Sequence, residues 1–123
     1  MTPATSQTPK NLAKLIGSAK RLLYLLVEYA PTDWTDDTAV YVSGGNIVTD
    51  ADLAALLDAS LETVARWRRT LRTVGLIDWL SDGRQGRVLR VAAGTRAITE
   101  ALKYGGPKAD PSKETKIVRE WLQ

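Results

Sequence analysis

Residues 49–91 read TDADLAALLDASLETVARWRRTLRTVGLIDWLSDGRQGRVLRV, and this stretch decides the fold. We predict a helix over 50–57, a tight turn at 58–60 and a second helix from 61 to about 74. Strands at 77–80 and 88–91 follow, and the connection 81–87 contains an Asp-Gly pair that favours a hairpin. We therefore expect a mainly α fold with a small β-hairpin, in the α+β class.

The ends of these two helices carry their own signals. Thr49 and Ser60 are good N-cap residues, because a side-chain hydroxyl accepts a hydrogen bond from a free N–H of the first turn. Asp50 and Asp52 lie in the first turn after Thr49, where the positive end of the helix dipole stabilises carboxylates. Capping thus explains these acids without a catalytic role. Gly75 stands where a left-handed residue usually ends a helix.

The second helix has one apolar and one polar face. We expect the core to receive the apolar face, whose members are spaced three and four residues apart: Val64, Trp67, Leu71 and Val74. A helix held in this way can present its other face to the major groove of DNA, where arginine takes guanine and glutamate accepts from cytosine. The expected base contacts are Glu62, Thr63, Arg66 and Arg69. The expected contacts to the DNA backbone are Ser60, Arg68 and Arg72 on the helix, and Arg84, Gln85 and Arg87 at the hairpin tip.

The composition excludes several kinds of site. The chain has 123 residues, enough for one domain with a core, and contains neither cysteine nor histidine. Zinc sites of thiolates or imidazoles, a Ser-His-Asp triad and a Cys-His dyad are therefore excluded. No apolar run approaches the ~18–20 residues of a transmembrane helix, so we expect no membrane partner. We also expect no metal, no cofactor and no enzymatic activity.

Charge is distributed unevenly along the chain, whose net charge is +3. Residues 1–27 contain only basic charges, residues 28–62 contain only acidic ones, and residues 63–90 contain seven arginines against two aspartates. Segregation of this kind indicates a face that binds a polyanion, opposite an acidic face. The alternative interpretation is that the arginines are solubilising or pair with the acidic segment.

We expect a disordered leader over 1–9, a domain over 10–93 and a helical extension over 94–123. Residues 10–29 have the apolar spacing of a scaffold helix, which Gly17 weakens and Pro31 ends. Trp34, in the acidic loop 31–39, is expected to plug the edge of the core. Residues 40–42 and 47–48 predict two short strands around a glycine turn, or else an irregular loop.

The extension contains two further helical patterns. The first covers 95–104 and ends at a Gly-Gly-Pro sequence. The second, KETKIVREWLQ at 113–123, carries an apolar stripe that predicts a homodimer or another protein contact, or else packing on the same domain. This stripe consists of Ile117, Val118, Trp121 and Leu122.

The run LAALLDASLETVARWRRTLRTVGLI is similar to the usual pattern of the winged helix-turn-helix superfamily. The matching pieces are Leu53-Ala54, Leu57, Val64, Trp67, Leu71, Gly75-Leu76-Ile77 and the wing 83–87. Asp58 departs from the pattern, because many members have glycine in the turn, but aspartate also adopts left-handed conformations. With SAKRLLYLLVEYA upstream, the chain resembles helix-turn-helix domains of phage and plasmid replication initiators, primosome-type proteins and small transcription regulators.

The resemblance covers roughly residues 12–92 and implies sequence-specific binding of double-stranded DNA through the helix 61–74 and the wing 81–87. Transcriptional regulation is the first hypothesis, because only a short tail follows the wing. DNA-replication initiation, or an accessory role in a phage or plasmid primosome, is the second. Both imply a cytoplasmic, nucleoid-associated protein. A third hypothesis is a protein-interaction module that uses the acidic 28–62 surface.

Overall fold

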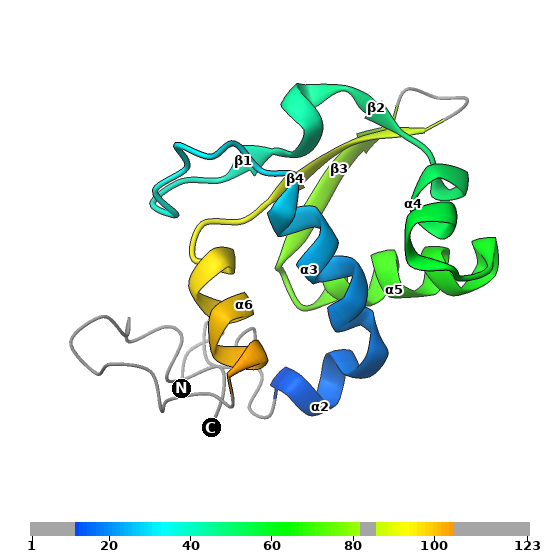
Figure 1. Ribbon diagram of the computed structural model, residues 1–123, viewed down its shortest axis with the longest axis horizontal. Helices are drawn as coiled ribbons and strands as arrows, with labels where there is room; N and C mark the ends of the chain where they lie inside the picture. The colour runs from blue at the N-terminus through cyan, green and yellow to red at the C-terminus, as the bar shows by residue number, and fades with distance from the viewer. Residues whose placement is uncertain (1–11, 82–85, 105–123) are drawn as a thin grey trace.

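The computed structural model describes residues 12–81 and 86–104, in which helices and a small antiparallel sheet surround one core (Figure 1). This mixture of helices and a sheet agrees with the predicted α+β class. In chain order the elements are α2 (Leu12–Ile16), the 3-10 helix η1 (Gly17–Ala19), α3 (Lys20–Glu28), β1 (Val40–Tyr41), the 3-10 helix η2 (Val42–Gly45), β2 (Ile47–Val48), α4 (Asp50–Leu57), α5 (Leu61–Thr73), β3 (Ile77–Ser81), β4 (Arg87–Val91) and α6 (Thr95–Lys103).

The N-terminal helical segment is divided at Gly17, where the sequence predicts a weak point. Gly17 adopts a φ of 49°, a conformation open to glycine at low cost, and the chain makes one 3-10 turn before α3 begins. The buried side of α2, η1 and α3 consists of Leu12, Ile16, Ala19, Leu22, Leu23 and Leu26. Each fully buried leucine contributes roughly 1.5–3 kcal/mol relative to an exposed one, so this segment supplies much of the core.

β4 is the centre of the sheet. On one side it pairs with β3 in the predicted hairpin, from Ile77 opposite Val91 to Ser81 opposite Arg87. On its other side it pairs with both β1 and β2. The expectation of two strands around a glycine turn is therefore correct only in part, because β1 and β2 form two pieces of one edge. Val42 turns inward between them and is 1% exposed.

α4 begins with the predicted cap and ends in a left-handed residue. The Thr49 hydroxyl accepts a hydrogen bond from the Asp52 N–H at 3.0 Å, and the Asp52 carboxylate accepts one from the Thr49 N–H at 3.4 Å. Asp58 follows α4 with φ 52° and ψ 52°, so aspartate takes the left-handed position expected of it.

α5 is capped at both ends. The Ser60 hydroxyl accepts a hydrogen bond from the Thr63 N–H at 3.1 Å. At the other end Gly75 adopts a φ of 87°, its N–H donates to the Arg72 carbonyl, and the Leu76 N–H donates to the Leu71 carbonyl, both at 3.0 Å. This pair of bonds is a Schellman motif, and it turns the chain sharply from α5 into β3.

α6 belongs to the same core as the preceding elements. Ile98 and Ala101 are 1% and 4% exposed, and α6 packs on α3. Figure 1 shows α6 on one side of α3, with α4 and α5 on the other. Within the described residues, the start of the predicted extension over 94–123 thus packs on the same core as the preceding elements.

Gly86 lies at the start of β4, where another strand approaches closely. A Cβ atom on Gly86 would lie 2.6 Å from Cγ2 of Ile47 and 2.7 Å from the carbonyl oxygen of Val48. Its φ is not positive, so the close approach of β2, and not a left-handed conformation, requires glycine here. The absent side chain allows β2 to pack against the hairpin.

We predict that Gly86→Ala lowers the free energy of unfolding by about 1–3 kcal/mol, because the new methyl group must displace the β2 backbone. Urea unfolding followed by circular dichroism measures this change. Gly44→Asn is the control: Gly44 has φ 63° and ψ 21°, with no atom within 4 Å of its Cβ position. Asparagine tolerates that conformation, so the control changes stability by less than about 1 kcal/mol. Equal effects of the two substitutions would contradict the steric explanation.

Candidate nucleic-acid interface

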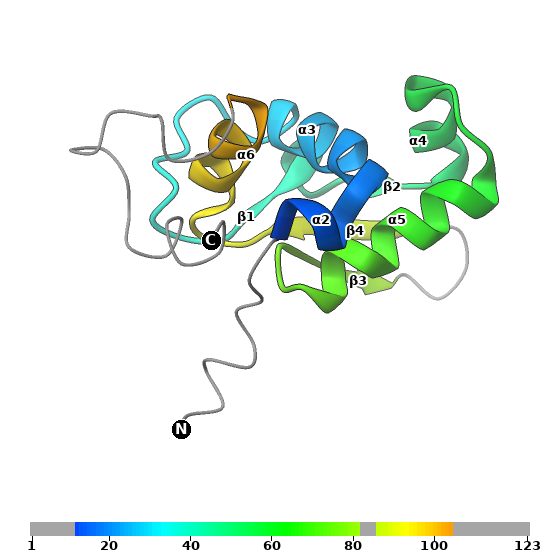
Figure 2. The same ribbon diagram turned by 90° about the horizontal axis from the view of Figure 1, so that it is seen from below.

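α5 buries one face and exposes the opposite one, as the sequence predicts. Val64 and Leu71 are 0% exposed and Trp67 is 6% exposed. Half a turn away are the exposed residues Glu62, Arg66, Arg69 and Thr73. Figure 2 shows α5 running along an edge of the molecule. The outward face of α5, defined by these four residues, is thus accessible to a large ligand.

The structure places three of the four expected base-contacting residues on one face of α5. Glu62, Arg66 and Arg69 lie on the outward face of α5. Thr63 is half-buried, and its hydroxyl oxygen accepts a hydrogen bond from Ser60 at 2.8 Å. Ser60 is exposed, but its hydroxyl is already used in capping α5. Arg66 and Arg69 are therefore the strongest candidates for contacting bases.

Arg68 corrects an expectation. We expected it on the flank of α5, facing phosphates, but it is only 5% exposed. Its Nε and Nη2 atoms donate to the two carboxylate oxygens of Asp50, each at 2.9 Å, and its guanidinium lies 4.8 Å from the centre of the Trp79 ring. The bidentate pair and the aromatic cover bind Arg68 inside the protein, so it is not an accessible phosphate ligand.

Asp50 and Trp79 join three elements at this point. Asp50, the first residue of α4, also lies 3.4 Å from Nη1 of Arg87 on β4. Trp79 on β3 lies against Arg68 and Arg72 of α5, at 4.8 Å and 4.1 Å from its ring centre. We call Asp50, Arg68, Trp79 and Arg87 the arginine clamp. It holds α4, α5 and the hairpin in one arrangement.

Arg87 also differs from its expected position. It is the first residue of β4, paired with Ser81 at the loop end of the hairpin, and its side chain, 28% exposed, binds Asp50. The alternative interpretation, in which arginines pair with the acidic segment, is therefore correct for Arg68 and Arg87, both of which bind Asp50. Arg84, Gln85 and the stripe Ile117, Val118, Trp121 and Leu122 lie outside the described residues.

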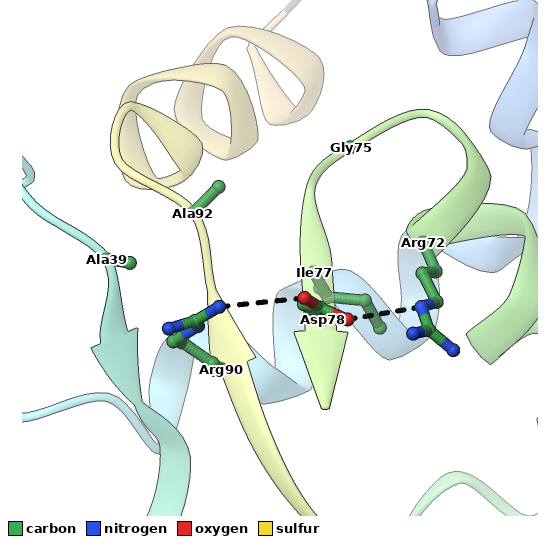
Figure 3. Close-up of a pocket in the computed structure, with 7 residues that line it drawn as sticks. All are labelled: Ala39, Arg72, Gly75, Ile77, Asp78, Arg90 and Ala92. Atoms are coloured by element: carbon green, nitrogen blue, oxygen red, sulfur yellow. Dashed lines mark ion pairs between the residues drawn. The ribbon is translucent and has the colours of Figure 1, made fainter. Parts of the chain in front are cut away.

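Arg72 is held at the edge of β3 but stays accessible. Its Nε atom lies 3.1 Å from Asp78, whose other carboxylate oxygen lies 3.5 Å from Nη2 of Arg90 (Figure 3). These side chains line an open pocket of about 400 Å³ together with Ala39, Gly75, Ile77 and Ala92. The Arg72 side chain is 50% exposed, so it can still contact a phosphate at its outer side.

Sequence reasoning missed the role of Trp79. The alternation of strand residues could have indicated it, because Trp79 shares a face with Ile77, which is 3% exposed. An inward tryptophan opposite an arginine-rich helix favours stacking with guanidinium groups. Asp50 does more than stabilise the start of α4, because it also binds Arg68 and Arg87. No signal in the sequence connected Asp50 with these two arginines, which lie 18 and 37 positions further along the chain.

The acidic segment does not form one surface. Asp36 lies at the N-terminus of α6, where its carboxylate accepts hydrogen bonds from the N–H groups of Arg96 and Ala97, each at 3.0 Å. Asp50 and Asp52 lie at the start of α4, at the far side of α3 in Figure 1.

Trp34 packs at the edge of the core, as predicted, and is 7% exposed. Arg96 lies 4.8 Å from its ring and donates to its carbonyl oxygen at 3.0 Å.

The residues that the structure describes offer few other kinds of site. Among them, no three side chains of histidine, cysteine, aspartate or glutamate are grouped as metal ligands would be. None of the described helices has the length and apolar character needed to cross a bilayer.

We predict that Asp50→Asn destabilises the protein by about 2–3 kcal/mol, because it leaves the buried Arg68 guanidinium without its counter-charge. Thermal unfolding at fixed pH and ionic strength measures the loss. Asp33→Asn, in the exposed part of the acidic loop, is the matched control and should change stability by about 0.5 kcal/mol or less. A loss at Asp50 no larger than the control's would show that the arginine clamp is not important for stability.

The function of this surface is inferred from its own geometry. The chain matches no protein-family model and no curated protein sequence.

Proposed function

We propose that this protein has a winged helix-turn-helix fold and binds double-stranded DNA sequence-specifically, with α5 in the major groove. The order α3, β1 and β2, α4, α5, β3, β4 supports the fold, and the β3–β4 hairpin corresponds to the wing. The observation that carries the proposed function is the outward face of α5. It holds Arg66 and Arg69, exposed, on a helix whose opposite face is buried.

The dimensions of this face fit the major groove. A helix with its side chains is about 10–12 Å wide, and the major groove of B-DNA is about 12 Å wide. Arg66 and Arg69 are three residues apart, which corresponds to roughly 4.5 Å along the helix axis. Successive base pairs are about 3.4 Å apart, so the two guanidinium groups can address neighbouring base pairs. Bidentate bonds from arginine to guanine would then supply specificity.

The arginine clamp supports this proposal by fixing the orientation of α5. Specific readout requires that the bonding groups be held in position before binding, since ordering flexible elements lowers affinity. Arg68 and Trp67 are both held within the protein, and Arg66 and Arg69 flank them along the chain. Rotation of α5 about its axis would require breaking the Asp50–Arg68 pair.

Transcriptional regulation is the role that we favour, in a protein located with the nucleoid in the cytoplasm. The described residues share one core, and a single compact unit is compatible with this role. A role in starting replication, or as a primosome accessory protein of a phage or plasmid, is the second candidate and uses the same face. The acidic surface of the third hypothesis is less favoured, because Asp36, Asp50 and Asp52 have structural partners.

The test is selection of bound duplexes from a random pool at a stated salt concentration, followed by binding measurements on the selected duplex. We expect one enriched motif. Arg66→Ala with Arg69→Ala should reduce affinity for it by about 30-fold or more, since each bidentate contact is worth about 1–3 kcal/mol and two are lost. Affinity for an unrelated duplex should fall much less.

Arg90→Ala is the matched control for these arginine substitutions. Arg90 is exposed on β4, and its ion pair with Asp78 is a surface pair that contributes little stability. This variant should bind the selected duplex within about twofold of the unmodified protein. Failure to enrich any motif, or full specific binding by the double variant, would refute the proposed function.

A further inference from the structure

The basic N-terminal segment lies beside the outward face of α5. Within residues 12–27 the chain carries Lys14, Lys20 and Arg21 and no acidic residue. The sequence predicts a scaffold helix for this segment, and its buried leucines do form part of the core. Its cations, however, are all exposed, although Arg21 also lies against the Trp67 ring. The DNA contacts proposed for α5 and the hairpin do not include these cations.

α2 and α5 border a shared groove. The groove has a volume of about 310 Å³ and is lined by Leu15, Arg66, Arg69, Thr70, Thr73 and Val74. α2 thus reaches the same arginines that we propose as base contacts, and Figure 2 shows the two helices side by side. Lys14 is exposed and directly precedes Leu15 in α2. The helix that supplies Leu15 to this groove therefore also carries Lys14.

Arg21 places a second cation on the same flank. Its guanidinium lies 5.4 Å from the centre of the Trp67 ring, and its Nη2 atom donates to the carbonyl oxygen of Leu57. Leu57 is the last residue of α4, so Arg21 stands beside the turn that leads into α5. Lys14 is thus carried by α2, which packs on α5 beside the groove, and Arg21 stands beside the turn into α5.

This flank is opposite the hairpin. Arg68 and Arg72 face β3, since both lie against Trp79, whereas Thr70 and Val74 line the groove beside α2. With about 100° per residue, these two pairs of positions lie roughly on opposite sides of α5. A helix in the major groove has a phosphate backbone on either side of it. The hairpin side can serve one backbone, and the Lys14–Arg21 side faces the other.

We propose that Lys14 and Arg21 form a second phosphate-binding flank, which contacts the DNA backbone on the side of α5 away from the hairpin. This inference rests on the proposed function, because it requires α5 to enter the major groove. The ligand is the phosphodiester backbone of a duplex, and the contacts are independent of base sequence. They place DNA-binding residues in α2 and α3, outside the helix-turn-helix and the hairpin.

The salt dependence of binding tests this proposal. Each lost phosphate contact lowers the magnitude of the slope of log K against log salt by about 0.9 for B-DNA. Lys14→Gln should therefore lower that slope by about 0.9 and weaken binding to the selected duplex and to an unrelated duplex by a similar factor. Lys14→Arg should restore both. Arg21→Gln should act in the same direction, but Lys14 carries the test because its exposed side chain can change without affecting the turn.

Lys103→Gln is the matched control, with the same change of charge. Lys103 lies on α6, where its ammonium group is 5.1 Å from the centre of the Tyr24 ring, and both views place α6 across α3 from α5. Its slope should equal that of the unmodified protein. Equal slopes for the unmodified protein, Lys14→Gln and Lys103→Gln would overturn the second flank while leaving the role of Arg66 and Arg69 intact. An equal reduction of the slope in Lys14→Gln and Lys103→Gln would overturn the second flank as well, because it would indicate a general effect of net charge. Absence of any duplex binding by the unmodified protein would refute the proposed function itself.

Discussion

The pairing of Arg68 with Asp50 is the interaction on which the arrangement of α4, α5 and the hairpin depends. Burying a guanidinium is costly, and the cost is offset only where the charge is paired and its N–H groups are bonded. Asp50 supplies both through two hydrogen bonds of 2.9 Å, and Trp79 covers the guanidinium face. Since Asp50 begins α4, Arg68 belongs to α5 and Trp79 belongs to β3, the pair and its aromatic cover together require three separate elements to meet.

This requirement connects local structure to the proposed readout. The caps at Thr49 and Ser60 fix where α4 and α5 begin, and the Schellman motif at Gly75 fixes where α5 turns into β3. The arginine clamp then fixes how α5 is rotated. With Val64 and Leu71 fully buried, Arg66 and Arg69 must point outward. The same helix thus uses neighbouring arginines for opposite purposes, one inside the protein and two on its surface.

Local signals predicted much of this fold. The caps, the left-handed Asp58, the end of α5 at Gly75 and the β3–β4 pairing all follow from residues close together in sequence. The outward placement of Arg66 and Arg69 follows from helical periodicity alone. These features depend on backbone geometry and on the spacing of apolar residues, both of which a sequence displays directly.

Long-range contacts could not be predicted in the same way. Helical periodicity places Arg69 outward and Arg68 on the flank of α5, but only the positions of Asp50 and Trp79 make Arg68 buried. Asp36 caps α6 from 60 residues away, so it could not be distinguished from the other acids of its loop. β2 packs so closely against Gly86 that a side chain there would clash. The sequence does not reveal this contact, because β2 and Gly86 are far apart along the chain.

The most direct test of the central claim, that the outward face of α5 is the DNA-reading surface, is a nitrogen-15 NMR titration of the protein with its selected duplex. We predict that the largest amide shifts occur in α5 around Arg66 and Arg69 and in α2 beside the groove, with α6 and the loop at Asp36 nearly unchanged. Shifts concentrated in α6 and the acidic loop, with α5 unaffected, would contradict the account.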